Sequence, residues 1–183
     1  WHQERSVEGY DCIILPSGQS YGSALRGGAI SRHAPVMSAV EEFAANGGLI
    51  LGIANGFQIL CEAGLLPGTL MPNRHLRFES RNVYVRVDET STPFTRLYEQ
   101  GQVIQLPIAH ADGNYFVDSE TLQELHANRQ IVFRYSDAAG QLTELSNPNG
   151  SLEHIAGVCN RERNVLGLMP HPEHAVEKLT GPS

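Results

Sequence analysis

The 183-residue sequence has little cysteine, no excess of positive charge and no long apolar run. The three cysteines, Cys12, Cys61 and Cys159, are odd in number and widely spaced, which disfavours a disulfide framework or a cysteine-bound metal cluster. We expect them to be buried thiols in a reducing compartment. No run approaches the roughly 20 apolar residues that cross a membrane, and no signal peptide is recognisable. The sequence therefore predicts a cytoplasmic protein.

The charge balance argues against two classes of partner. There are 13 lysine and arginine residues against 20 aspartate and glutamate residues, a formal net charge of −7. Proteins bind nucleic acids and anionic membranes through a positively charged surface, so neither is expected to be a partner. The length and the apolar content of 41% indicate an ordinary globular chain, which we interpret as one domain over residues 1–183.

One stretch organises the rest of the chain. Residues 48–51 form a short apolar run that predicts a buried strand, and residues 57–60 predict a helix. Gly52 and Gly56 lie two positions on either side of Ala54, the spacing of a nucleophile elbow, whose tip stands at a helix N-terminus. The tip of such an elbow carries serine or cysteine, and here it carries alanine. The alternative is an ordinary glycine turn in a buried strand–helix unit.

Alternating and helical periods predict an α/β chain. The strands are expected over residues 11–16, 48–51, 76–87, 102–108, 131–135, 155–159 and 165–169. The helices are expected over residues 24–30, over residues 36–44, after the elbow, and after a cap at Ser119. Residues 137–150 are polar and rich in turn formers, which is typical of a mobile loop.

The last expected strand leads into Pro170-His171-Pro172-Glu173. A strand end can place an imidazole and a carboxylate side by side, with His171 as general base and Glu173 as the group that orients it. The alternative is an exposed histidine and glutamate that follow a strand.

These motifs carry a resemblance to a known family. Residues 52–60, 107–110, 147–151 and 169–173, in this order, resemble the glutaminase subunit family of phosphoribosylformylglycinamidine synthase (PurQ type), a class I glutamine amidotransferase of purine biosynthesis. The resemblance extends over nearly the whole chain. It implies an α/β fold with an open, mixed, largely parallel sheet flanked by helices, flavodoxin-like and three-layered. It also implies that this single domain is truncated at both ends and lacks the family's first strand and last helix.

The resemblance implies a reaction and its residues. A cysteine at the position of Ala54 would attack the side-chain amide of glutamine, with His171 and Glu173 as the other members of the triad. Backbone N–H groups of Gly18 and Asn55 would hold the oxyanion. The residues implied to bind substrate are Gln58, His110 and Asn114. The ammonia would pass to a synthetase subunit, which uses ATP and Mg²⁺ and is joined by a small bridging subunit, so no cofactor is expected in this chain.

Several positions depart from the family pattern. Ala54 replaces the cysteine, and a methyl group cannot attack a carbonyl, so the chain is expected to be inactive as written. In addition, His174 stands where the family has arginine, Ala111 where it has glycine and Asp112 where it has glutamate. The other departures are Ser17, Gln19, Ser23, Ala24 and Gly27. An engineered Cys→Ala change would alter only position 54, whereas a diverged copy would alter the pocket as well.

Two alternatives to a glutaminase follow from the missing nucleophile. The first is a non-catalytic pseudo-enzyme that serves as a binding or scaffold module. The second is an unrelated α/β hydrolase with Ser20 as nucleophile, although no base is suggested near it. The histidines His110, His154 and His174 lack the paired spacing of metal ligands, so no metal site is expected.

Overall fold

The computed structural model describes residues 4–18 and 27–176. Its strands are β1 (Cys12–Leu15), β2 (Leu49–Ile53), β3 (Thr69–Met71), β4 (Glu79–Val87), β5 (Val103–His110), β6 (Asn114–Phe116), β7 (Ile131–Ser136), β8 (Ile155–Cys159) and β9 (Val165–Leu168). Its α-helices are α1 (Gly27–Ser31), α2 (Val36–Ala45), α3 (Asn55–Glu62) and α4 (Ser119–Ala127). Three 3₁₀ turns complete the described elements: η1 (Glu144–Ser146), η2 (Leu152–His154) and η3 (Pro172–His174).

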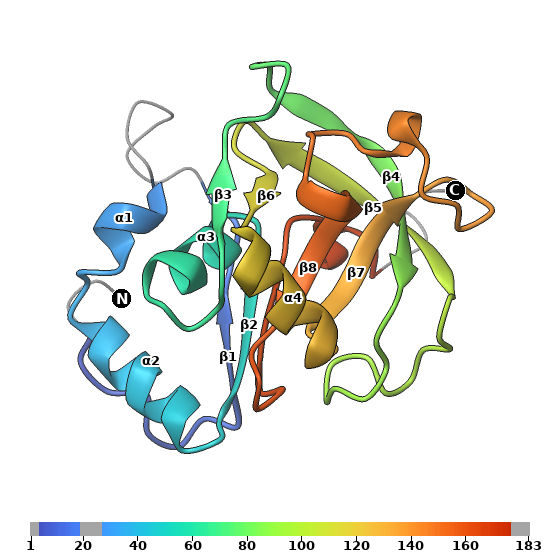
Figure 1. Ribbon diagram of the computed structural model, residues 1–183. Coiled ribbons are helices and arrows are strands. Elements are labelled where there is room, and N and C mark those ends of the chain that lie inside the picture. The colour runs from blue at the N-terminus through green and yellow to red at the C-terminus, as the bar shows by residue number, and fades with distance from the viewer. Residues whose placement is uncertain (1–3, 19–26, 177–183) are drawn as a thin grey trace.

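The main sheet has seven strands in the order β1-β2-β9-β8-β7-β4-β5 within the described residues. The pairs β1–β2 and β2–β9 are parallel, and the other four pairs are antiparallel. The α/β fold with an open, mixed sheet is thus confirmed. Parallel pairs are confined to one half of the sheet, so they make up a smaller share of the strand pairs than expected. The reason is that strands consecutive in the chain, β4 with β5 and β8 with β9, pair directly and are therefore antiparallel. Figure 1 shows these strands side by side, with α3 and α4 in front of them.

The parallel half carries the apolar runs that the sequence analysis expected to be buried. Ile50 of β2 is fully buried, and its neighbours in register are Ile13 of β1 and Val165 of β9. Strands of parallel sheets are buried on both faces of the sheet, which explains the continuous apolar run. The carboxyl ends of β1, β2 and β9 therefore meet at one edge of the sheet.

The helices form where the apolar period and the end signals agree. In α2, Met37, Val40 and Ala44 are buried on one face, and Gly47 ends the helix with a φ of 84°. The expected cap of α4 at Ser119 is wrong by one residue. Asp118 is the N-cap, and its carboxylate accepts a hydrogen bond from the Thr121 amide at 2.8 Å.

Two features were not anticipated. The strands β3 and β6 pair as a separate two-stranded antiparallel sheet. Residues 137–150 are closely hydrogen-bonded rather than open: the Asp137 carboxylate accepts from the amides of Ala139 and Gln141, and Thr143 and Ser146 form a reciprocal cap around η1. The expectation of a loosely held loop is therefore not supported by its bonding.

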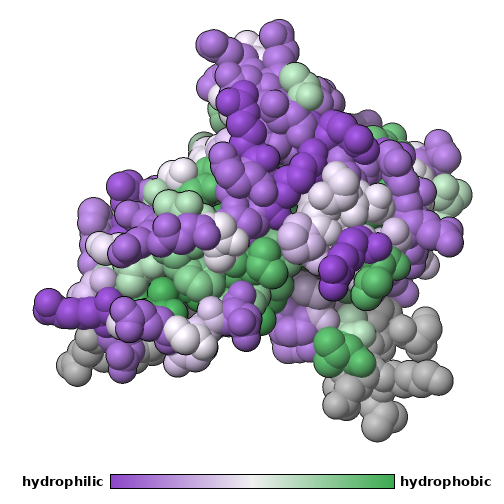
Figure 2. All heavy atoms as spheres, turned by 90° about the horizontal axis from the view of Figure 1, so that it is seen from below, coloured by the Kyte–Doolittle hydropathy of each residue, from purple (hydrophilic) through white to green (hydrophobic). Residues whose placement is uncertain are grey.

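The core lies between the sheet and the helices. Phe57 of α3 stacks on Tyr115 of β6 with ring centroids 5.7 Å apart, which packs this helix against the two-stranded sheet. Apolar residues also reach the surface, where Ile14 of β1 is 56% exposed, and Figure 2 shows apolar side chains near the middle of the face seen from below. Cys12 is exposed and only Cys159 is buried, so burial of all three thiols was a wrong expectation. No helix in the described residues has the length and apolarity needed to cross a membrane.

Candidate active site

The turn between β2 and α3 holds Ala54 in a strained conformation. Ala54 has φ 49° and ψ −103°, which lies outside the regions that alanine ordinarily adopts and costs about 1–3 kcal/mol. Its amide donates to the Leu168 carbonyl oxygen at 2.8 Å, and its carbonyl accepts from the Gln58 amide at 3.2 Å. Ala54 is 4% exposed. The turn therefore places a buried side chain between the end of β2 and the start of α3, which is the position of the tip of a nucleophile elbow.

The two glycines beside this turn are needed for packing. A Cβ on Gly56 would meet the carbonyl oxygen of Leu15 in β1, and a Cβ on Gly52 would lie 2.8 Å from the carbonyl carbon of Gly56. These close approaches let α3 lie directly against the sheet. The close approach of the backbones therefore explains why glycine occupies both positions around Ala54.

His171 and Glu173 form a pair just beyond β9. The Nδ1 atom of His171 lies 2.8 Å from Oε1 of Glu173, and the backbone amide of His171 donates to the Pro107 carbonyl oxygen at 2.9 Å. The imidazole is buried, whereas the carboxylate is partly exposed. The Nε2 atom of His171 is also buried and has no hydrogen-bond partner among the described residues. An unpartnered ring nitrogen of this kind is available to a group that enters the site.

Ser17 adds a third contact to this pair. It follows β1, and its hydroxyl donates to Oε1 of Glu173 at 3.3 Å. Ser17, Ala54 and His171 thus come from the ends of three adjacent parallel strands. Such an edge is where open α/β sheets bind ligands.

The residues expected to hold an oxyanion flank the same edge. Gly18 is exposed and follows Ser17, and Asn55 is the first residue of α3, whose first-turn amides have no partner within the helix. The neighbouring departures at residues 19–26 lie outside the described residues.

Gln58 lies one turn into α3 and is held by the segment after β5. Its side-chain amide donates to the Asp112 carbonyl oxygen at 2.9 Å. Asn114 is in β6, opposite Met71 of β3. Both residues are partly buried, and the Asp112 contact fixes the side chain of Gln58.

His110 is buried at the end of β5, where two asparagine side chains contact its ring. Its Nδ1 atom is 3.0 Å from Oδ1 of Asn73, and its Nε2 atom is 3.4 Å from Nδ2 of Asn149. Burial, and to a lesser extent the charge of His171, lowers the pKa of His110 to about 4, so its imidazole is neutral at pH 7. Because Nδ2 of Asn149 can only donate, Nε2 of His110 is the acceptor and Nδ1 carries the proton. Nδ1 is thus engaged by Asn73, whereas Nε2 has only the longer contact with Asn149, whose amide group also donates to the Gly113 carbonyl oxygen and the Tyr135 hydroxyl.

Asn73 and Asn149 are functional-site neighbours that the sequence analysis did not single out. Asn73 also accepts from the Gly113 amide at 3.0 Å, and Asn149 donates to the Gly113 carbonyl oxygen at 2.8 Å. Both side chains are fully buried. They fix residues 110–113 and so fix the carbonyl oxygen that holds Gln58. Asn149 lies in one of the strings that carried the family resemblance, which was the one signal for it.

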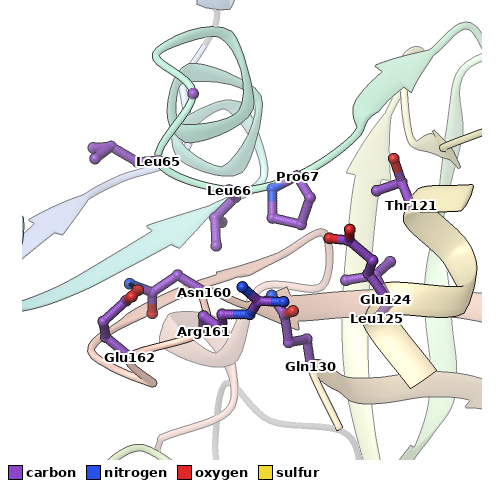
Figure 3. Close-up of a pocket in the computed structure, with 11 residues that line it drawn as sticks. Leu65, Leu66, Pro67, Thr121, Glu124, Leu125, Gln130, Asn160, Arg161 and Glu162 are labelled. Carbon is purple, nitrogen blue, oxygen red and sulfur yellow. Dashed lines mark hydrogen bonds between the residues drawn. The ribbon is translucent and has the colours of Figure 1, made fainter. Parts of the chain in front are cut away.

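A separate hollow lies away from this edge. Figure 3 shows it between the turn after α3, helix α4 and the turn that joins β8 to β9, with a volume of about 460 Å³. Arg161 extends along it toward Gln130. Its lining residues are Gly64, Leu65, Leu66, Pro67, Thr121, Glu124, Leu125, Gln130, Asn160, Arg161 and Glu162. None of the residues expected in the active site lines it.

Comparison with known proteins adds an independent line of argument. A family model described as a CobB/CobQ-like glutamine amidotransferase domain matches residues 1–183. The chain is 57% identical over 183 residues to phosphoribosylformylglycinamidine synthase subunit PurQ of Moorella thermoacetica, covering all of this chain and 78% of that relative. It is 54% identical over 181 residues to the protein of the same name from Acaryochloris marina, covering 99% of this chain and 77% of the relative.

Solved structures agree on the fold. A chain in the structure of PurLQS from Thermotoga maritima aligns with a TM-score of 0.83 at 42% identity, over 96% of this chain and 75% of that one. A glutamine amidotransferase from Thermotoga maritima aligns with a TM-score of 0.57 at 18% identity, over 93% of this chain and 59% of that one. At that lower identity the likeness concerns the fold alone.

Proposed function

The chain belongs to the CobB/CobQ-like glutamine amidotransferase family and, within it, to the PurQ subunits of phosphoribosylformylglycinamidine synthase, and we propose that it serves as such a subunit in purine biosynthesis. In this role the framework hydrolyses glutamine to glutamate and supplies ammonia to a synthetase subunit. The observation that carries the proposal is that the strained Ala54 turn and the His171–Glu173 pair follow the ends of the adjacent parallel strands β2 and β9, in a chain this similar to PurQ proteins.

The proposed reaction needs a thiol where Ala54 stands. The thiol sulfur adds to the side-chain carbonyl carbon of glutamine while Nε2 of His171 takes the thiol proton. The C–N bond then breaks, and His171 returns the proton to the leaving ammonia. Water hydrolyses the resulting glutamyl thioester to glutamate and the free thiol. The buried, unpartnered Nε2 of His171 supports this division of roles.

The neighbouring groups have supporting parts. Glu173 accepts from Nδ1 of His171 and so leaves Nε2 as the nitrogen that takes up the proton, and the Ser17 hydroxyl donates to the same carboxylate oxygen, Oε1. The amides of Gly18 and Asn55 stabilise the oxyanion. Gln58 and Asn114 bind the substrate, with Gln58 positioned through Asp112.

As written, the chain lacks the attacking atom. Removal of the nucleophile from such a triad leaves only binding and oxyanion contributions, which costs several orders of magnitude in rate. We therefore propose that this chain does not hydrolyse glutamine, although its fold and the other groups of the site remain in place.

The wider setting follows from the relatives. We propose that the chain assembles with a synthetase subunit and a small bridging subunit, as the name PurLQS suggests for the protein from Thermotoga maritima. The chain itself needs no cofactor, because ATP and Mg²⁺ act in the synthetase. Its place in purine biosynthesis and its net charge of −7 support a cytoplasmic location with neither nucleic acid nor membrane as partner.

The experiment that tests the proposal measures amidation by the assembled complex. With glutamine as nitrogen source, the complex that contains the unsubstituted chain should be inactive, and Ala54→Cys should restore amidation of formylglycinamide ribonucleotide. With ammonium chloride as nitrogen source, both complexes should be active, which controls for assembly. If Ala54→Cys gives no glutamine-dependent activity while ammonium supports the reaction, the pocket is not that of a glutaminase.

The alternative of a binding or scaffold module makes a different prediction for the same complexes. A scaffold would also support the ammonium-dependent reaction, yet Ala54→Cys would add nothing. Calorimetry with glutamine separates the two further, because an intact pocket binds glutamine without the thiol.

A further inference from the structure

One turn gathers three potential metal ligands. The 3₁₀ turn η3 contains Glu173 and His174, and His171 is its N-cap. We call these three residues the His–Glu–His cluster. The amide of His174 donates to the His171 carbonyl oxygen at 3.3 Å. Residues three apart lie above one another in a 3₁₀ turn, and the two imidazole centroids are 5.6 Å apart. The turn therefore brings both histidines to the same side, beside the carboxylate.

The distances within the cluster suit a small ion. One ligand atom from each residue lies within 4.8 Å of the other two. Oε1 of Glu173 is 2.8 Å from Nδ1 of His171 and 3.9 Å from Nε2 of His174. Tetrahedral zinc with bonds of about 2.0–2.1 Å places its ligand atoms about 3.4 Å apart. The distance from Glu173 to His171 has to lengthen and the distance from Glu173 to His174 has to shorten, which the partial exposure of Glu173 and the larger exposure of His174 allow.

The exposure of the cluster gives an ion a path to it. The side chain of His171 is 7% exposed, that of Glu173 35% and that of His174 65%. One buried ligand and two more exposed ones form an open site rather than a closed structural one. An arginine at position 174, the residue expected from the family pattern, offers no ligand at neutral pH. The site is thus particular to chains that carry histidine there.

We propose that His171, Glu173 and His174 bind a Zn²⁺ ion through two imidazoles and one carboxylate, with water in the fourth position. This donor set is one that zinc takes in open sites. Metal binding at Nδ1 of His171 replaces the contact with Glu173 and leaves the ring proton on Nε2. The imidazole then has no nitrogen that can accept a proton. Zinc at this cluster therefore blocks the role of His171 as a base, and the ion itself binds whether or not the chain is a glutaminase.

The experiment uses Co²⁺ and Zn²⁺ added to the metal-free chain. Because the exposed Cys12 thiol can also bind these ions, all titrations use the Cys12→Ser background. Co²⁺ should produce visible d–d absorption typical of a four-coordinate site, and Zn²⁺ should displace it with a one-to-one stoichiometry. His174→Arg should weaken Zn²⁺ binding at least tenfold, since loss of even an outer contact to a ligand costs about 10–100-fold.

The matched control is His33→Gln, which removes an exposed histidine outside the cluster and should leave the Zn²⁺ affinity unchanged. Because His174 is exposed, its replacement should also leave the thermal midpoint of the metal-free chain unchanged. Glu173→Gln provides a second variant that should weaken binding. Equal affinities for the parent and His174→Arg, or the lack of d–d absorption in the parent, would overturn the proposal. Either result would leave the proposed glutaminase role intact, because the readout is binding alone.

Discussion

Acid should destabilise the fold through His110. Burial lowers the pKa of this imidazole to about 4 from its ordinary value of 6.5, and Asn73 and Asn149 contact its two nitrogens. Because the folded-state pKa lies below the unfolded-state pKa, the unfolded chain takes up the proton first as the pH falls. The stability is therefore complete above about pH 6.5 and is lost progressively toward pH 4.

The size of the effect follows from the difference between the two pKa values. Each pKa unit corresponds to 1.36 kcal/mol, so lowering the pH from 7 to 5 should cost about 2 kcal/mol through His110 alone, and about 3 kcal/mol below pH 4. His171 and His75, which lie near enough to oppose its protonation, reinforce the direction of the change.

The direct assay is an NMR titration of the histidine rings. The His110 imidazole should stay neutral, with its proton on Nδ1, down to about pH 5, and its ring signals should shift only below that pH. Urea unfolding at pH 7 and pH 5 gives the accompanying change in the free energy of unfolding. A His110 pKa close to 6.5 would refute the argument, because it would mean that the ring is solvated or that its two asparagine contacts do not hold.

Three substitutions test the packing around the site and the helix ends, each by urea unfolding. Asn73→Ala should cost about 2–4 kcal/mol, because the Asn73 side chain takes part in four hydrogen bonds, three of them buried, and a loss below about 0.5 kcal/mol would show that these contacts are unimportant. Asp118→Ala should cost about 1 kcal/mol while the matched Ser119→Ala costs a few tenths at most, and a reversed order would restore Ser119 as the cap. Gly56→Ala should cost more than about 3 kcal/mol, since its methyl group would meet the Leu15 carbonyl oxygen; a protein of native stability would contradict the close approach of α3 to β1.

The sequence predicted an element well where a periodic pattern of apolar residues extended over many residues, or where a turn required one particular residue type. The apolar spacing of α2 and the alternation in β4 led to elements that the structure contains, within a few residues at their ends. The glycines around Ala54 indicated the elbow because only glycine allows two backbones to approach so closely. Three-residue strands such as β3 and β6 are too short to show a period, and they form because Tyr115 and Leu70 are buried by distant parts of the chain.

The sequence predicted which strand ends carry the candidate site, but not the hydrogen bonds that support it. Adjacent strands that end at one edge made Ala54 and His171 neighbours in any parallel arrangement of β2 and β9. The role of His110 could not be deduced in this way, since its partners Asn73 and Asn149 are remote in sequence and asparagine is common in loops. The grouping of His174 with His171 and Glu173 depended on the 3₁₀ turn, which no periodic signal marks.

The central claim is that the Ala54 turn and the His171–Glu173 pair form one glutaminase site that lacks only its thiol. The measurement that tests it most directly is ammonia release from glutamine by the Ala54→Cys protein in the presence of its synthetase partner, compared with the same protein that also carries His171→Gln. The account predicts release by the single variant and a loss of about 10²–10⁴-fold in the double variant, the usual contribution of a positioned base. Equal rates in the two proteins, or no release by either, would contradict it.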